Sequence, residues 1–144
     1  MDGAPENARK KKNSSYLRMR EGRSFAVGAY LNRDGCTAGI VDICGEVAAK
    51  RRLHLSGFRA GDKLDPLVDA VDDMIYESGV APERIIGLGL SAPGPLDEKS
   101  GRILNPPRFD LWHNTAIVDY LKCRTDMPVY LENNTSCLAR YNYK

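Results

Sequence analysis

The 144-residue chain has few of the residues that build metal centres or disulfide frameworks. It contains two histidines and four cysteines, and the cysteines lack the C-x-x-C spacing of zinc or redox motifs. His54 and His113 are isolated histidines without a second ligand at metal-binding spacing. We therefore predict no metal site and no cofactor, and we interpret the cysteines as reduced thiols of a cytoplasmic protein.

Long apolar runs are also missing. No run approaches the roughly 20 residues that a membrane-spanning helix needs, and the N-terminus lacks the apolar core of a secretory signal. A hydrophobic content of 42%, a charged content of 28% and a net charge of +2 are typical of one globular domain. We predict a soluble protein that has no membrane partner.

Residues 1–24 differ in composition from the rest of the chain. Residues 9–12 form the basic run RKKK, and Arg18, Arg20 and Arg23 follow with few apolar neighbours. Clustered like charge and low hydrophobicity favour a mobile linker or tail. A nuclear-localisation role or contact with the DNA backbone is the alternative for such a run.

The core is predicted to begin at Phe25. Apolar residues alternate over 25–31, residues 32–35 read N-R-D-G, and further strands are predicted at 37–41 and 46–55. Because Asp-Gly is a strong hairpin signal, these segments predict an antiparallel meander of three strands.

Two helices are predicted between later strands. Asp65 can serve as an N-cap, with Pro66 at the first helical position and Gly79 just past the last turn. Asn114 or Thr115 can cap a second helix. Each segment has apolar residues at helical spacing, so each is predicted to pack on the sheet.

The stretch 85–107, IIGLGLSAPGPLDEKSGRILNPP, is the most informative part of the sequence. Residues 85–90 are apolar without alternation, which predicts a strand buried on both faces. Residues 91–95 contain two prolines and a glycine that end this strand, and Asn105-Pro106-Pro107 forms a second rigid loop. Ligands of open α/β sheets bind beyond the carboxyl ends of strands, so the site is predicted here.

The last part of the chain predicts one more strand at 127–131 and a helix at 135–143. The triplet Glu132-Asn133-Asn134 lies between them. Together with the preceding segments, this order predicts an α/β fold with a mixed sheet and helices packed on it.

The apolar strand followed by A-P-G-P, D-x-x-x-G and L-N-P-P resembles the ROK family of repressors, open reading frames and sugar kinases. The resemblance covers residues 25–144. It implies the N-terminal lobe of an actin-like ATPase (ribonuclease H-like) fold, truncated before the second lobe. It also implies that residues 8–19 are the tail of a basic junction that follows a winged helix in the family's repressors.

The family's kinases carry a phosphate loop, D-(I/L)-G-G-T, after the first strand. Its Asp lies twelve positions before the Asp of a later turn, and counting back twelve from Asp42 gives Tyr30. Tyr30 therefore replaces the Asp, and Asn32, Arg33 and Asp34 replace the rest of the loop. Because side chains crowd a phosphate where glycines would admit it, we predict a degenerate phosphate loop that does not bind ATP in the usual way.

The family's kinases also read E-N-D where this chain has Glu132-Asn133-Asn134. Asn134 stands where the resemblance places the catalytic Asp. A carboxamide cannot act as a general base, although it can hydrogen-bond to a sugar hydroxyl. We therefore predict no catalytic residue; Asn133 or Asn134 could instead cap the following helix.

The resemblance implies a set of sugar-binding candidates at the strand ends. Asn105 could instead lock its own loop through an Asx turn, and both interpretations stay open here. The candidates are Ser91, Ala92, Gly94, Asn105, Asn133 and Asn134.

These features favour a fragment of a ROK-type transcriptional regulator that binds an effector, a sugar or sugar phosphate, without kinase activity. DNA contact is expected only through a winged helix absent from this chain, and the protein is expected to form a homo-oligomer. A ROK sugar kinase and a non-enzymatic sugar-binding protein remain the alternatives.

Overall fold

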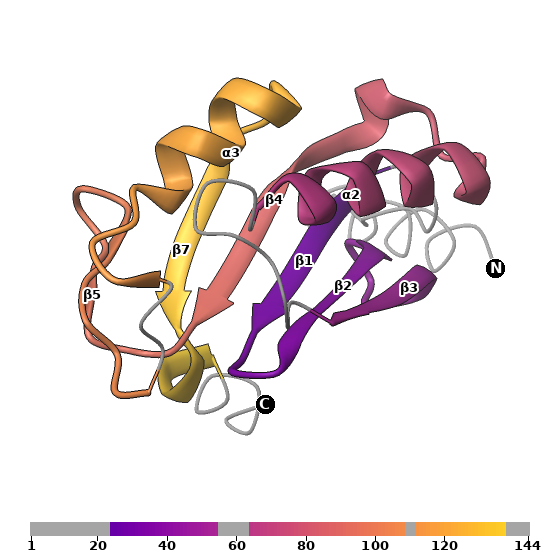
Figure 1. Ribbon diagram of the computed structural model, residues 1–144. Coiled ribbons are helices and arrows are strands. Elements are labelled where there is room, and N and C mark those ends of the chain that lie inside the picture. Colours follow the sequence, from indigo (N-terminus) through magenta and orange to yellow (C-terminus); the bar gives the residue numbers. More distant parts are fainter. Residues whose placement is uncertain (1–23, 55–63, 109–111, 138–144) are drawn as a thin grey trace, which may run out of the picture.

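The computed structural model describes residues 24–54, 64–108 and 112–137. Its main sheet has five strands in the order β3-β2-β1-β4-β7 (Figure 1). The strands are β1 (Phe25–Leu31), β2 (Gly35–Asp42), β3 (Val47–His54), β4 (Ile85–Ala92) and β7 (Val129–Asn133). Strands β1, β2 and β3 form the predicted antiparallel meander, whereas β4 runs parallel to β1 and β7 runs parallel to β4. The predicted mixed sheet is confirmed.

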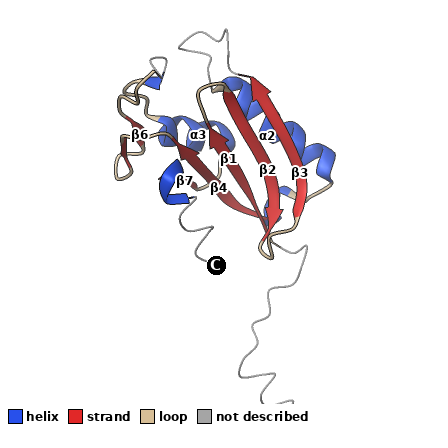
Figure 2. Cartoon of the chain, turned by 90° about the horizontal axis from the view of Figure 1, so that it is seen from below, coloured by secondary structure: helices blue, strands red, loops and turns tan. Residues whose placement is uncertain are grey.

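The helices cover one face of this sheet. The remaining elements are α2 (Asp65–Ser78), the 3₁₀ helix η1 (Pro82–Arg84), α3 (Ile117–Thr125), and a small hairpin of β5 (Leu96–Asp97) and β6 (Arg102–Ile103). Helices α2 and α3 lie on the same side of the strands, as both views show (Figures 1 and 2). No helix in the described ranges is long and apolar enough to cross a membrane.

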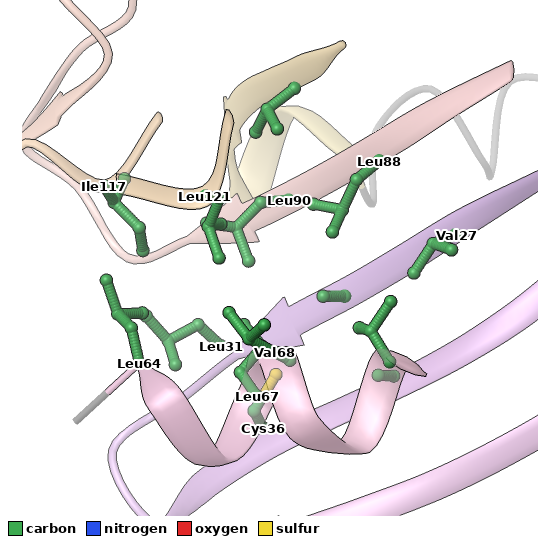
Figure 3. Close-up of a cluster of buried hydrophobic side chains, with 14 of the residues drawn as sticks. Val27, Leu31, Cys36, Leu64, Leu67, Val68, Leu88, Leu90, Ile117 and Leu121 are labelled. Atoms are coloured by element: carbon green, nitrogen blue, oxygen red, sulfur yellow. The ribbon is translucent and has the colours of Figure 1, made fainter. Parts of the chain in front are cut away.

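The core lies between the sheet and these two helices. Every second residue of β1 faces the helices, because side chains of a strand alternate between its two faces. Leu31, Leu88, Ile117 and Leu121 are completely buried there (Figure 3). Burying an aliphatic side chain of this size contributes roughly 1.5–3 kcal/mol, so this layer holds the sheet and helices together.

The opposite face of the sheet is uncovered in the described part of the chain (Figure 2). Ile86 on β4 is 60% exposed and Tyr130 on β7 is 71% exposed. The prediction that residues 85–90 are buried on both faces is therefore wrong. The register between β1 and β4 shifts between Phe25 and Val27, so the strand does not alternate regularly. Gly87 and Leu88 are both buried, and the exposed positions between 85 and 90 hold Ile86 and Gly89, so the run shows no period of two.

Two element boundaries near the first helix and β4 differ from the predictions. Helix α2 spans the predicted residues and ends at Gly79 with a φ of 72°, as predicted. Its N-cap, however, is Leu64, and Asp65 is already helical and makes no capping hydrogen bond. Strand β4 continues to Ala92, so the strand ends immediately before Pro93 rather than at Leu90.

The second helix also begins later than predicted. The N-cap of α3 is Ala116, which makes no side-chain cap. The two predicted caps have other partners: the Asn114 side-chain oxygen accepts from Arg102 at 3.1 Å, and the Thr115 backbone pairs with Ile103. Residues 134–137 are helical, and the rest of the helix predicted at 135–143 lies outside the described residues. The basic segment 1–23 also lies outside them.

Candidate functional site

Three segments meet at the carboxyl ends of the parallel strands (Figure 1). They are the β1–β2 turn at residues 32–35, the loop at residues 93–95 after β4, and residues 133–134 at the end of β7. We call this group the strand-end site. Its location beyond the strand ends is where open α/β sheets bind ligands, and it contains six of the predicted degenerate-loop and sugar-binding residues.

The β1–β2 turn is closed by the Asn32 side chain. Its Oδ1 accepts hydrogen bonds from the backbone N–H groups of Asp34 and Gly35, both at 2.9 Å. The Asn32 N–H in turn donates to the Gly35 carbonyl at 2.9 Å. The predicted hairpin is confirmed, and its backbone donors are used by the chain itself.

Replacing Asn32 with Ala is expected to lower the free energy of unfolding by about 1 kcal/mol, because two backbone donors lose their acceptor. Urea denaturation followed by circular dichroism would measure this loss. Asn105→Ala is the matched control, since Asn105 is exposed and its change should stay within about 0.5 kcal/mol. Equal stabilities of the two variants would argue against a closing role for Asn32.

Asn134 reaches from the end of β7 to the end of β1. Its Nδ2 donates to the Leu31 carbonyl at 3.1 Å, although β4 lies between the two strands. Its Oδ1 is buried and makes no hydrogen bond within the described part of the chain. A buried acceptor without a partner is uncommon, so this oxygen marks a place where a ligand donor would be stabilised.

Asn133 has a different role. Its Oδ1 accepts from the Thr135 N–H at 2.8 Å, which caps the helical turn that begins at Asn134. Its Nδ2 lies so close to Gly94 that a Cβ on Gly94 would overlap it. The glycine after Pro93 therefore makes room for this amide.

The other predicted residues lie around this group. Asn105 is exposed, and the neighbouring Leu104 N–H donates to the Pro95 carbonyl at 3.1 Å, so the two predicted loops are joined. Ala92 is fully buried, so its side chain faces the core and not the strand-end site. Ser91 is half-buried and points to the uncovered face of the sheet.

A groove of about 500 Å³ lies in that uncovered face and extends toward the strand ends. Tyr30, Ser91 and Glu132 line it from three adjacent strands, because Ser91 is paired with Tyr30 and with Glu132. Glu132 was missing from the predicted sugar-binding set, although its place in the triplet with Asn133 and Asn134 was a signal. Tyr30 is 41% exposed and was predicted only as part of the degenerate loop.

The described residues contain no group of three or more His, Cys, Asp or Glu side chains that could hold a metal ion. All four cysteines are free thiols. Burial raises the pKa of the Cys36 thiol to about 12, so this cysteine stays protonated and packs as an apolar side chain.

A family profile described as "ROK family" matches residues 31–143. The chain belongs to the ROK family. It is 23% identical to the xylose repressor of Bacillus spizizenii over 115 residues, which cover 80% of this chain and 29% of the repressor. The structure of a ROK family transcriptional regulator, a homologue of the E. coli MLC protein, matches with a TM-score of 0.69 and 20% identity over 78% of this chain and 28% of that one.

A ROK hexokinase from Thermus thermophilus also matches, with a TM-score of 0.64 and 28% identity over 76% of this chain and 35% of the hexokinase. These likenesses confirm the predicted fold class, the N-terminal lobe of the actin-like ATPase fold. The chain therefore spans roughly a third of the length of these ROK relatives. Regulators and kinases both occur among them.

Proposed function

We propose that this chain is the first lobe of the effector-binding region of a ROK-type transcriptional regulator, which binds a sugar and does not phosphorylate it. The observation that carries this proposal is the state of the β1–β2 turn. Asn32 occupies the N–H groups of Asp34 and Gly35. A kinase needs such donors free, because phosphoryl transfer depends on backbone groups and cations that hold the phosphates.

The opposite side of the strand-end site supports the same proposal. Asn134 presents a carboxamide where a kinase of the family would present a carboxylate. A carboxamide cannot take the proton of the sugar hydroxyl, so the general-base contribution of roughly 10²–10⁴ in rate is lost. Its oxygen can still accept a hydrogen bond from that hydroxyl. Binding without reaction is the expected result.

In a regulator, the bound sugar acts because its affinity differs between two arrangements of the protein. A sugar that prefers one arrangement of the two lobes or of a dimer shifts the population toward that arrangement. The shift would change the distance between the two DNA-reading helices of a dimer. Each of these helices would belong to a winged helix outside this chain. The basic run at residues 9–12 is consistent with a junction to such a domain.

We expect the full-length protein to form no ADP from ATP above background with D-glucose, D-xylose or N-acetyl-D-glucosamine. Active kinases turn over at roughly 1–100 s⁻¹, and we expect less than about a hundredth of the lower value. A coupled ADP assay that includes a commercial hexokinase as the positive control would measure this. Sugar-dependent ADP formation in the kinase range would overturn the proposal.

The second candidate is a ROK sugar kinase. It is favoured by the 28% identity to the Thermus thermophilus hexokinase, which exceeds the 23% identity to the Bacillus spizizenii repressor. The ADP assay decides between these two functions. A non-enzymatic sugar-binding protein without a DNA-binding domain would also form no ADP, and sugar-dependent retention of promoter DNA separates it from a regulator.

A further inference from the structure

A second groove, of about 710 Å³, lies at the end of the sheet opposite to the strand-end site. It is bordered by the last turns of α2, the start of β4 and the segment that joins α3 to β7. The parallel strands begin at this end of the sheet (Figure 1). We call it the amino-end groove, and its lining includes Asp72, Ile75, Tyr76, Ile85, Asp126 and Met127.

The amino-end groove combines apolar side chains with two carboxylates. Asp72 and Asp126 line it, whereas no lysine, arginine or histidine of the described residues does. Tyr76 also lines it and is 88% exposed. An exposed aromatic ring is a favourable partner for a guanidinium group. The groove therefore suits a ligand that is both apolar and positively charged.

The charge of α2 favours a cation at the same place. The exposed positions of this helix carry Asp69, Asp72, Asp73 and Glu77. Burial, together with the neighbouring Asp69 and Asp73, raises the pKa of the Asp72 carboxyl group. A nearby cation would relieve this repulsion.

The arginines near the groove are used elsewhere. Arg51 pairs with Asp73 at 3.4 Å and with Glu77 at 2.8 Å. Arg124 lies 3.5 Å from the Asp65 carboxylate and stacks over the Tyr120 ring at 5.0 Å. Neither arginine lines the groove, so within the described ranges its two carboxylates face no basic lining residue.

The residues that precede β1 have the composition that this groove requires. Residues 16–20 read YLRMR, two arginines among apolar side chains. The chain enters β1 at Phe25, which is paired with Ile85 in the wall of the groove. Neighbouring strands are about 4.8 Å apart and an extended chain spans roughly 3.3 Å per residue, so residues 16–20 are within reach. A short tether gives an effective concentration on the order of millimolar, so weak contacts are enough.

We propose that the amino-end groove binds residues 16–20 of its own chain, with an arginine of this segment beside Asp72 and the Tyr76 ring. This interaction goes beyond the proposed function, because it requires neither a sugar nor the strand-end site. In a regulator it would fix the segment before β1 to the first lobe. The segment would then move with the lobe when the lobe moves.

Photo-crosslinking of the full-length protein tests this placement. Tyr76→p-benzoylphenylalanine puts a photoreactive ring at the groove, at a side chain that is exposed and outside the core. Cleavage after Glu6 and Glu21 releases residues 7–21 as one peptide, which mass spectrometry identifies. We expect irradiation to join residue 76 to this peptide within one chain. The matched control is the same replacement at Tyr130, which is 71% exposed on the uncovered face of the sheet and should give little of this product.

A second change tests the role of charge. Adding Asp72→Lys to the photoreactive protein should lower the crosslinking yield at least about threefold, because the cation loses its partner. Asp119→Lys makes the same change at an exposed position of α3 outside the groove and should leave the yield unchanged.

A different crosslinked peptide, no crosslinked peptide, or a product joined to a second copy of the chain would overturn the proposal. Equal yields from positions 76 and 130, or a yield that Asp72→Lys does not change, would overturn it as well. The measurement is made without a sugar, so failure of the sugar-binding function would not alter its result.

Discussion

Restoring the family's acidic residue by Asn134→Asp is expected to destabilise the protein by roughly 3 kcal/mol at pH 7 and to create no kinase activity. The Nδ2 of Asn134 donates to the Leu31 carbonyl at 3.1 Å. An ionised carboxylate at this position would lose that hydrogen bond and place its charge against the carbonyl oxygen, in a part-buried site. Chemical denaturation at pH 7 would measure the loss.

The destabilisation should depend on pH in a defined direction. Burial and the facing carbonyl raise the pKa of the introduced carboxyl group in the folded protein above its value in the unfolded chain. A raised pKa stabilises the folded state below the unfolded value, and this stabilisation is lost as the pH rises through the folded value. The protonated acid can also donate to the Leu31 carbonyl. The difference from wild type is therefore expected to be full at pH 7 and to shrink toward pH 4.

Asn133→Asp is the matched control, because it makes the same chemical change at the neighbouring residue. Asn133 accepts a hydrogen bond from the Thr135 N–H at the start of a helical turn. A carboxylate is an equally good cap there and is favoured by the helix dipole. The control should change stability by less than about 1 kcal/mol. If Asn134→Asp were as stable as this control at pH 7, the contact between Asn134 and Leu31 would not matter energetically.

The sequence predicted best what depends on local pattern. The alternation in residues 25–31 and the Asp34-Gly35 turn identified the first hairpin, and Pro66 and Gly79 placed helix α2. The N-caps of α2 and α3 were predicted wrongly because tertiary contacts determine them. Asn114 is used by Arg102 of the neighbouring β6, and no pattern within the helix itself indicates that partner.

The site could be located from sequence, but its chemistry could not. Proline, glycine and asparagine at strand ends indicated where the loops meet. The hydrogen bond between Asn134 and Leu31 joins residues that are 103 positions apart, and no local signal indicates it. The sequence identified Gly35 as a turn residue, but it gave no sign that the Leu53 carbonyl of β3 lies where a Cβ on Gly35 would be.

Gly35→Ala is expected to destabilise the protein by about 3 kcal/mol, as overpacking against backbone atoms does. A Cβ on Gly35 would overlap the Leu53 carbonyl oxygen and would lie 3.3 Å from the His54 Cα, both in β3. These atoms belong to a paired strand and cannot move aside as a flexible side chain would. Thermal and chemical unfolding of the purified variant would measure the change.

Gly28→Ala is the matched control for this prediction. Gly28 lies on the neighbouring strand, and nothing approaches within 4 Å of its added Cβ, so that variant should be unchanged or up to about 1 kcal/mol more stable. A large loss confined to Gly35→Ala would show that this glycine is required by the close approach of β3. Equal stability of the two variants would contradict that account. A role of Gly35 in ligand binding would then be the alternative.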